Sequence, residues 1–189
     1  MAGIFSTLSK VAVLCKEDWE TNGRRWSSPG FQALLVYRSL HHLRAVQSPI
    51  ARLLRVPIAL AYLFVRNIYG IELPPKAVLG RRLKISHQGC IVLNQGARLG
   101  DDCRIRHCVT IGGMGSMAKP ERRGQPWLGD NVYLSVGATV LGPVNLGNGC
   151  LIGPHALVMD DVPEDGRAYG PKATIVSTSQ SELSRGDSL

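Results

Sequence analysis

Two histidines are the residues of this sequence best suited to moving a proton. His87 lies in the segment Ser86-His87-Gln88-Gly89, and His107 lies in Ile105-Arg106-His107. A neutral imidazole can take a proton from a hydroxyl near pH 7, which makes histidine the usual general base. A third group usually orients such a base, and Glu72 is the candidate carboxylate. We predict that His87 is the base and that His107 binds the acceptor or orients the base; the alternative is two histidines on an exposed face.

A six-residue repeat has to position these histidines. Apolar anchors recur every six positions at Leu73, Leu79, Ile85, Leu93, Leu99, Ile105, Ile111, Leu128, Leu134, Val140, Leu146, Ile152 and Val158, apart from two longer gaps. A period of six fits neither an amphipathic helix nor an alternating strand and is typical of the hexapeptide repeat of a parallel β-helix. The alternative is a Leu/Val-rich sandwich. Three walls make one coil, so about 18 residues advance the chain by one strand spacing of about 4.8 Å.

The two longer gaps in the repeat are where function is expected. The anchors Ile85 and Leu93 are eight residues apart, and this gap contains His87. Ile105 occupies the same wall one coil after Ile85, so the register predicts that His107 lies about 4.8 Å from His87. The second gap, from Ile111 to Leu128, reads as a loop that leaves the wall of the β-helix.

The chain before the repeats predicts helices over about 1–20, 31–45 and 50–68. The third combines apolar residues with arginines, so it could lie on a membrane surface; we prefer packing against the β-helix or a neighbouring subunit. Its longest apolar run, residues 56–65, is too short to span a bilayer. We therefore expect a helical segment over 1–70, a β-helix domain over 71–176 and a disordered tail over 177–189.

The composition narrows the partners. The 189 residues carry a formal charge of +8, which suits nucleic acid, an anionic membrane surface or a phosphate-bearing small molecule. No compact Lys/Arg run with interleaved aromatics occurs, so nucleic acid is not expected. The five cysteines form no CxxC pair and read as small core residues in a reducing compartment, with Cys103 and Cys150 at inward positions. We see no secretory signal and expect a cytoplasmic protein, peripheral to the membrane if the third helix binds lipid.

Three segments carry a resemblance to a known family. They are residues 80–89 (GRRLKISHQG), 105–113 (IRHCVTIGG) and 128–132 (LGDNV). They resemble the hexapeptide-repeat acyltransferases and, more narrowly, their serine acetyltransferase branch, over about residues 68–176. The resemblance implies a mainly β fold, a left-handed parallel β-helix after an N-terminal α-helical segment. It also implies a homotrimer and transfer of acetyl from acetyl-CoA to a hydroxyl without a metal.

The same resemblance assigns roles to single residues. His87 matches the family's general-base histidine, and Glu72 falls where the family has the aspartate that orients it. Ser86 stands where an aspartate helps to hold serine. Gln125 stands where the family has a second catalytic histidine, and Gly124 replaces the basic residue before that histidine. Two features suited to gripping free serine are therefore missing.

The donor site is also assigned by resemblance. In the family, CoA lies in the groove between neighbouring subunits, which by position would be lined here by Gly113, Val136, Pro154 and Lys172. Lys172 would meet a CoA phosphate as a point charge. A backbone N–H near Gly113 is the expected donor to the oxyanion. Direct transfer is the preferred route, with a covalent route through Cys108 as the alternative.

The acceptor is left open between two hydroxyls. Residues 26–29 (WSSP), 36–38 (VYR) and 105–107 (IRH) look more like the exopolysaccharide (colanic-acid type) acetyltransferases of this branch. We therefore expect a sugar O-acetyltransferase of exopolysaccharide biosynthesis. The alternative is a serine O-acetyltransferase of cysteine biosynthesis. A third possibility is a non-catalytic scaffold or a carbonic-anhydrase-like zinc protein, in which His87, His107 and His155 would be ligands.

Overall fold

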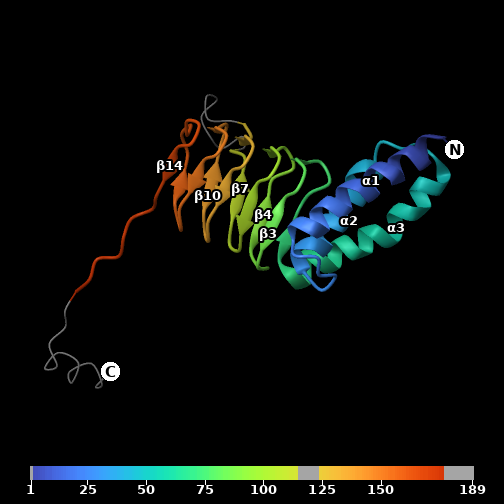
Figure 1. Cartoon of the computed structure of the whole chain (residues 1–189), viewed down its shortest axis with the longest axis horizontal. Helices are drawn as coiled ribbons and strands as arrows, with labels where there is room; N and C mark the ends of the chain where they lie inside the picture. The colour runs from blue at the N-terminus through green and yellow to red at the C-terminus, as the bar shows by residue number, and fades with distance from the viewer. Residues whose placement is uncertain (1, 115–123, 177–189) are drawn as a thin grey trace, which may run out of the picture.

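A helical end and a three-walled prism of strands make up the molecule (Figure 1). The computed structural model describes residues 2–114 and 124–176. Its helices are α1 (Ala2–Thr21), α2 (Pro29–Leu43) and α3 (Pro49–Phe64), and the last turn continues as the π-helix η1 (Val65–Tyr69). The three helices lie beyond the first coil of the prism, at the end that carries the N-terminus.

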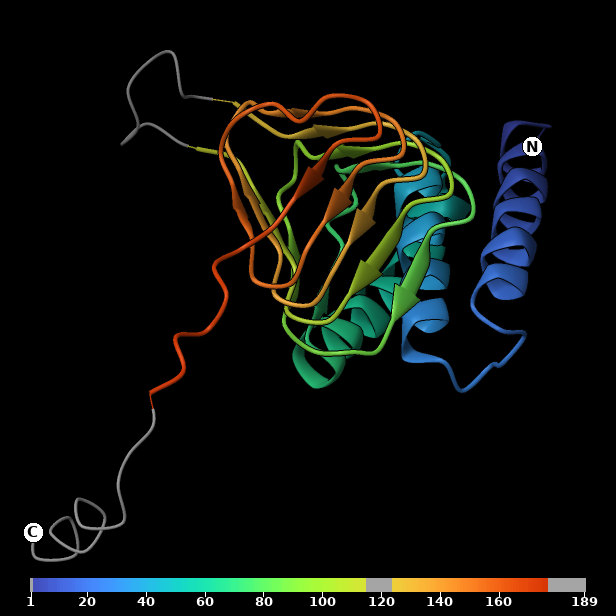
Figure 2. The same ribbon diagram turned by 60° about the vertical axis from the view of Figure 1, so that its left-hand side comes forward.

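The strands form three parallel sheets, which the chain enters in turn. Sheet A contains β1 (Ile71–Glu72), β4 (Ile91–Leu93), β7 (Thr110–Gly112), β10 (Thr139–Leu141) and β13 (Leu157–Val158). Sheet B contains β2 (Val78–Leu79), β5 (Arg98–Leu99), β8 (Trp127–Leu128) and β11 (Asn145–Leu146). Sheet C contains β3 (Lys84–Ser86), β6 (Arg104–Arg106), β9 (Tyr133–Leu134), β12 (Leu151–Ile152) and β14 (Arg167–Ala168). Figure 2 shows the triangular cross-section, and the prediction of a left-handed parallel β-helix is confirmed.

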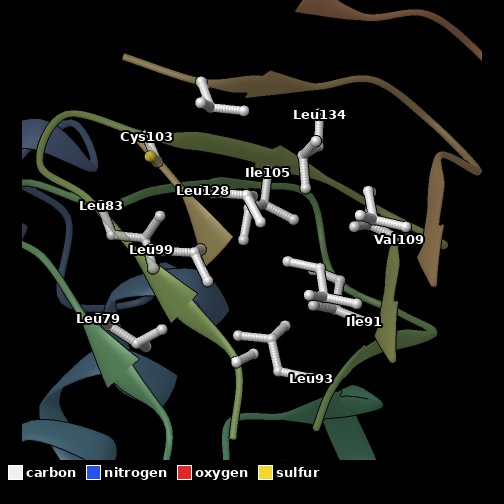
Figure 3. Packing of buried hydrophobic residues seen from close by; sticks show 14 of the residues in the cluster. Leu79, Leu83, Ile91, Leu93, Leu99, Cys103, Ile105, Val109, Leu128 and Leu134 are labelled. Atoms are coloured by element: carbon white, nitrogen blue, oxygen red, sulfur yellow. The ribbon is translucent and has the colours of Figure 1, made fainter. Parts of the chain in front are cut away.

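The core is the column of inward side chains inside the prism. Every anchor that the six-residue repeat predicts is buried. Leu79, Leu99 and Leu128 are register partners on sheet B and stack coil upon coil (Figure 3). Full burial of such a side chain contributes roughly 1.5–3 kcal/mol, so the repeat itself stabilises the fold. Cys103 and Cys150 are buried in this column, as the inward positions predict.

Glycines at one corner let successive coils approach closely. A Cβ on Gly80 would lie 2.2 Å from the carbonyl oxygen of Gly100, and a Cβ on Gly100 would lie 2.6 Å from the carbonyl carbon of Gly129. No side chain fits there without moving the backbone, which is why glycine follows so many anchors.

Helix α2 fixes the helical end to the first coil. Ser28 caps the helix by accepting a hydrogen bond from the Phe31 N–H, and proline occupies its first position. Arg38 is buried in this interface and donates to Asp18 of α1 at 2.8 Å and to the Leu79 carbonyl at 2.7 Å. Tyr37 donates its hydroxyl proton to the Ala77 carbonyl at 2.7 Å. These contacts hold α1 and α2 against the start of the prism.

Helix α3 differs from its expected packing. The three helices occupy the expected ranges to within a few residues, but Ala51 is the only described residue of α3 that is buried. Leu53 is 73% exposed, and Leu60 is 63% exposed. Within the described chain α3 packs on α2 and leaves most of its apolar side chains exposed, so its expected packing against the β-helix is not seen there; packing against a neighbouring subunit stays a prediction. No described helix is long and apolar enough to cross a bilayer.

The C-terminal end leaves the prism after β14. Residues 169–176 form no regular element, and most of their side chains are exposed. Figure 1 shows this segment leading away from the last coil. The predicted disorder of residues 177–189 and the tip of the loop, residues 115–123, lie outside the described residues.

Candidate active site

His87 and His107 lie on neighbouring coils at the corner between sheets C and A. β3 and β6 pair with Ile85 opposite Ile105, and the two histidines follow directly after these strands. Their ring centroids are 5.5 Å apart, and the rings are nearly perpendicular, at 88°. The register read from the sequence therefore brings the two imidazoles into contact, as predicted.

The eight-residue gap gives His87 an unusual backbone. Ser86 pairs with Arg106 and the N–H of Cys108 donates to the Gly89 carbonyl, so His87 and Gln88 are extra residues relative to the next coil. His87 has a φ of 70°, in the left-handed region, and its side chain is exposed. For a residue other than glycine, such a conformation costs roughly 1–3 kcal/mol; Cys90, Cys108 and His155 adopt it as well, so it belongs to the turns of the prism. The bulge thus places His87 outside the regular corner, facing solvent.

Arg106 is a contact of His87 that the sequence analysis missed. Its Nη2 lies 3.5 Å from Nε2 of His87, and its Nη1 donates to the Tyr133 hydroxyl at 3.4 Å. A guanidinium only donates hydrogen bonds, so it favours the form of His87 in which Nε2 carries no proton. For Nε2 to act as a general base, the acceptor hydroxyl has to replace Arg106 at this single lone pair. Ser86, paired with Arg106 in the register, lies on the same outer face of sheet C.

Two buried nitrogen atoms at this corner have no partner among the described residues. They are Nε of Arg106 and Nδ1 of His107. Buried polar atoms are normally hydrogen-bonded, so these two mark a place where a further group is expected. The position of Arg106, outward on a strand, resembles that of any exposed charge, and no local sequence signal separates it from the others.

Glu72 lies on the neighbouring wall. It is half-buried at the end of β1 and paired with Val92. In the described part of the chain, no hydrogen bond joins it to His87, so its orienting role stays a prediction. A groove of about 270 Å³ along the outer face of sheet A connects Glu72 with Thr110 and Gly112. Glu72 also lines a second cavity of about 400 Å³ with Arg44. Burial is the main cause that raises the pKa of Tyr62, and the charge of Glu72 adds to it.

Gln125 and Gly113 lie together at the opposite corner of sheet A. A Cβ on Gly113 would lie 2.4 Å from the Gln125 amide, and a Cβ on Gly96 would lie 2.5 Å from Cγ of Gln125. The backbone bridge between Met114 and Gly124 closes the base of the loop beside them. The groove of sheet A is lined neither by the two histidines nor by Gln125; it lies on the wall between the two corners.

The four residues assigned to CoA do not lie together in one chain. Val136 and Pro154 follow β9 and β12 and continue the corner that begins with His87 and His107; the N–H of His155 donates to the Val136 carbonyl there. Gly113 lies at the other corner, and Lys172 is exposed beyond the last strand. A groove between two neighbouring chains would be needed to unite them.

The cysteines differ in exposure. Cys90 and Cys108 are exposed at the histidine corner, whereas burial raises the pKa of Cys103 to about 11. Across residues 2–114 and 124–176, no group of three or more His, Cys, Asp or Glu side chains is placed to hold a metal ion.

Comparison with known proteins places this geometry in context. No family model matches the chain. It is 38% identical over 149 residues to a serine acetyltransferase of Helicobacter pylori, covering 79% of this chain and 82% of the relative. It is 31% identical over 162 residues to the putative colanic acid biosynthesis acetyltransferase WcaB of Escherichia coli, covering 84% of this chain and 96% of the relative. A solved serine acetyltransferase of Entamoeba histolytica, in complex with cysteine, superposes with a TM-score of 0.74 at 23% identity, covering 97% of this chain and 66% of that structure.

Proposed function

Because the chain belongs to the serine acetyltransferase family of hexapeptide-repeat acyltransferases, we propose that residues 71–176 form an O-acetyltransferase domain acting on a sugar hydroxyl. The chain is an acetyltransferase, and acetyl-CoA is its donor. The acceptor is a sugar of exopolysaccharide assembly, and His87 is the general base.

The mechanism is direct transfer. His87 Nε2 removes the proton of the acceptor hydroxyl while the hydroxyl oxygen attacks the thioester carbonyl carbon. The tetrahedral oxyanion accepts a hydrogen bond from a backbone N–H near Gly113 of a neighbouring chain, because Gly113 of the same chain lies at the opposite corner of sheet A. The C–S bond then breaks, CoA leaves as the thiolate, and the imidazolium returns its proton to sulfur. No residue of the protein needs to carry the acetyl group.

The lack of an acidic side chain among the described contacts of His87 is the observation that favours a sugar over serine. Arg106 could hold the carboxylate of free serine, but the ammonium group of serine is normally held by a carboxylate. The described side chains in contact with His87 are those of Arg106 and His107, Ser86 precedes it on β3, and none of the three is acidic. A neutral or anionic acceptor suits these surroundings better than an ammonium.

Thiol release from acetyl-CoA tests the proposal. We would compare a nucleotide-linked sugar, a lipid-linked sugar and free serine as acceptors, with wild type and His87→Ala. Removing a general base lowers the rate by about 10²- to 10⁴-fold. Gln88→Ala is the matched control, because Gln88 is exposed on the same bulge. Turnover with sugars that depends on His87 supports the proposal; equal rates for His87→Ala and wild type would overturn the role of His87.

Serine acetylation is the second candidate, and the 38% identity to a serine acetyltransferase favours it. It would require Gln125 and the groove beside Glu72 to hold serine without the family's basic residue, since Gly124 stands there. Serine-dependent turnover in the same assay, with no turnover on either sugar, would establish this candidate in place of the first.

We also infer a homotrimer with CoA in the groove between chains. Val92 and Leu157 are exposed on the outer face of sheet A, and Val78 and Trp127 are exposed on sheet B. Such apolar walls are typical of surfaces that a neighbouring chain covers. Light scattering should give three times the chain mass of 20.5 kDa. A monomer that is fully active would contradict the shared groove.

Peripheral membrane contact through α3 extends the same proposal. Exposed apolar side chains, among them Leu53, Leu60 and Phe64, accompany Arg52 and Arg55 on this helix. An apolar face with nearby arginines matches an anionic lipid surface, which would also hold a lipid-linked acceptor. Sedimentation with vesicles of phosphatidylglycerol should carry wild type down and leave Leu53→Asp/Leu60→Asp in solution. Binding to a second trimer instead of to vesicles would overturn the membrane assignment.

A further inference from the structure

We propose that the outer face of sheet C beside His87 is a phosphate-binding subsite, so that the acceptor sugar is recognised through the phosphate or diphosphate group it carries. This inference rests on the proposed function. It names the class of acceptor: a sugar phosphate ester, supplied either as a nucleotide-diphosphate sugar or as a lipid-diphosphate sugar.

The subsite consists of three cations on two neighbouring strands. Lys84 of β3 pairs with Arg104 of β6, and two residues further along each strand Ser86 pairs with Arg106. The buried residues Ile85 and Ile105 lie between them, so the four flanking side chains share the outer face. Lys84, Arg104 and Arg106 therefore form one patch that reaches His87 through the 3.5 Å contact of Arg106.

The charge of this patch is not compensated within the described chain. No ion pair joins any of its three cations to a carboxylate there. Asp102 already takes two hydrogen bonds at 2.6 Å from Arg82. Those hydrogen bonds are the main cause that lowers the pKa of Asp102, and the charge of Arg104 adds to it.

The arrangement is unfavourable for the fold alone. Like charges directly opposite one another on neighbouring strands are destabilising. Arg106 also keeps a buried Nε–H without a partner, although a buried donor normally has one. A local conflict of this kind is typical of functional sites, where a ligand completes what the fold leaves open. Three positive charges with several free donors match a diphosphate, whose oxygens accept forked hydrogen bonds from arginine.

Tyr133 limits the patch and helps to set its geometry. It pairs with Arg104 in the register, and its hydroxyl accepts a hydrogen bond from Nη1 of Arg106 at 3.4 Å. The guanidinium of Arg106 therefore lies between Tyr133 of β9 on one side and His87, after β3, on the other. A phosphate on the patch would leave the attached sugar at the histidine corner, where Nε2 of His87 takes the hydroxyl proton.

Binding of inorganic pyrophosphate tests the subsite without reference to activity. Calorimetry on the full chain, with CoA saturating so that its own phosphate sites are filled, should detect pyrophosphate binding. Lys84→Gln/Arg104→Gln should weaken it by about tenfold or more, because the double variant removes two charged hydrogen-bond donors to the phosphate oxygens. Arg98→Gln is the matched control, because Arg98 is an exposed, outward strand residue on sheet B. Loss of pyrophosphate binding when CoA is added, or equal affinity of the double variant and wild type, would overturn the proposal.

Acetyl transfer then distinguishes the sources of the phosphate. The KM for the phosphorylated acceptor should rise about tenfold in the double variant, while the KM for acetyl-CoA stays unchanged. Preference for the nucleotide sugar or for the lipid-diphosphate sugar identifies the source, and either supports the subsite. An equal KM for the sugar with and without its phosphate overturns it. Serine-only turnover would instead refute the proposed function, and the pyrophosphate result would still decide the subsite. The double variant should unfold at or above the wild-type temperature, because it removes a repulsion.

Discussion

The buried ion pair between α1 and α2 predicts how firmly the helical end is held. Arg38 and Asp18 have side chains that are 3% and 0% exposed. Besides Asp18, Arg38 donates to the carbonyls of Leu79 and Gly80 in the first coil. Arg38→Met would leave the buried Asp18 carboxylate without its cation, with the Leu83 backbone as its remaining donor among the described residues, and two carbonyls without the guanidinium. Breaking a buried pair by removing one partner costs about 3–5 kcal/mol, and we expect a loss of that size in the free energy of unfolding.

A nearby surface pair provides the control. Arg81 and Glu17 also join α1 to the first coil, but the Arg81 side chain is 52% exposed. Exposed pairs contribute about 0–1 kcal/mol, so Arg81→Met should be nearly neutral. The double variant Asp18→Leu/Arg38→Met should recover much of the loss of Arg38→Met, because an apolar pair leaves no buried charge.

The measurement is urea unfolding followed by circular dichroism, at one protein concentration and with the oligomeric state checked. Burial raises the pKa of Asp18, and the hydrogen bond from Arg38 opposes that rise. Without Arg38, the pKa of Asp18 rises further above its unfolded value. The deficit of Arg38→Met should therefore be smallest at acidic pH, where only the lost hydrogen bonds to the carbonyls remain, and should grow as pH increases through that pKa. A loss no larger than that of Arg81→Met, or a deficit that does not change with pH, would refute the reasoning.

Three further predictions follow from single sites. Burial is the main cause that lowers the pKa of His42 to about 4. The free energy of unfolding should therefore fall as pH decreases from about 6.5 toward 4. His42→Gln should flatten that decrease in a series of thermal-unfolding measurements at different pH. A thiol reagent at pH 7.5 should label Cys90 and Cys108 before the buried cysteines, as mass spectrometry of the peptides would show; equal labelling of all five would contradict the burial. Gly80→Ala should destabilise by about 3 kcal/mol through its overlap with the next coil, whereas Gly3→Ala, with open space around it, should be neutral or stabilising by up to about 1 kcal/mol in urea unfolding.

The repeat explains why so much of the fold could be predicted. A period of six fixes which residues point inward, and three repeats fix which residue lies one coil away. Because each histidine follows its anchor, Ile85 or Ile105, by two positions in the sequence, the repeat alone predicts that His87 and His107 lie together. The same logic could not find Arg38, because a buried arginine within an amphipathic helix looks like any charged helical residue. Only the folded interface shows that its partners come from α1 and from the first coil.

The contacts of the site could not be predicted either, because they depend on side-chain rotamers that the repeat does not determine. Periodicity says that Arg106 points outward, but only its rotamer shows that it reaches back to His87. Glu72 was assigned by resemblance to an aspartate, and within one chain it lies on the next wall, beside the groove of sheet A. A groove completed by a neighbouring chain is invisible to any argument from one sequence, because the residues that meet there share no register.

The distribution of charge connects the fold to its proposed acceptor. The net charge of +8 is not spread evenly. Where the helical end meets the first coils, arginines are matched by acids, as in Arg38 with Asp18 and Arg82 with Asp102. One wall further on, beside His87, the cations of sheet C have no such partners in the described residues. If the positive net charge served only solubility, acidic residues could equally have been placed beside the cations of sheet C. The pairing at the junction and the lack of it at the histidine corner instead concentrate positive potential where a hydroxyl must be delivered. An anionic acceptor would be drawn to that corner, and raising the salt concentration should increase its KM more than the KM of an uncharged sugar.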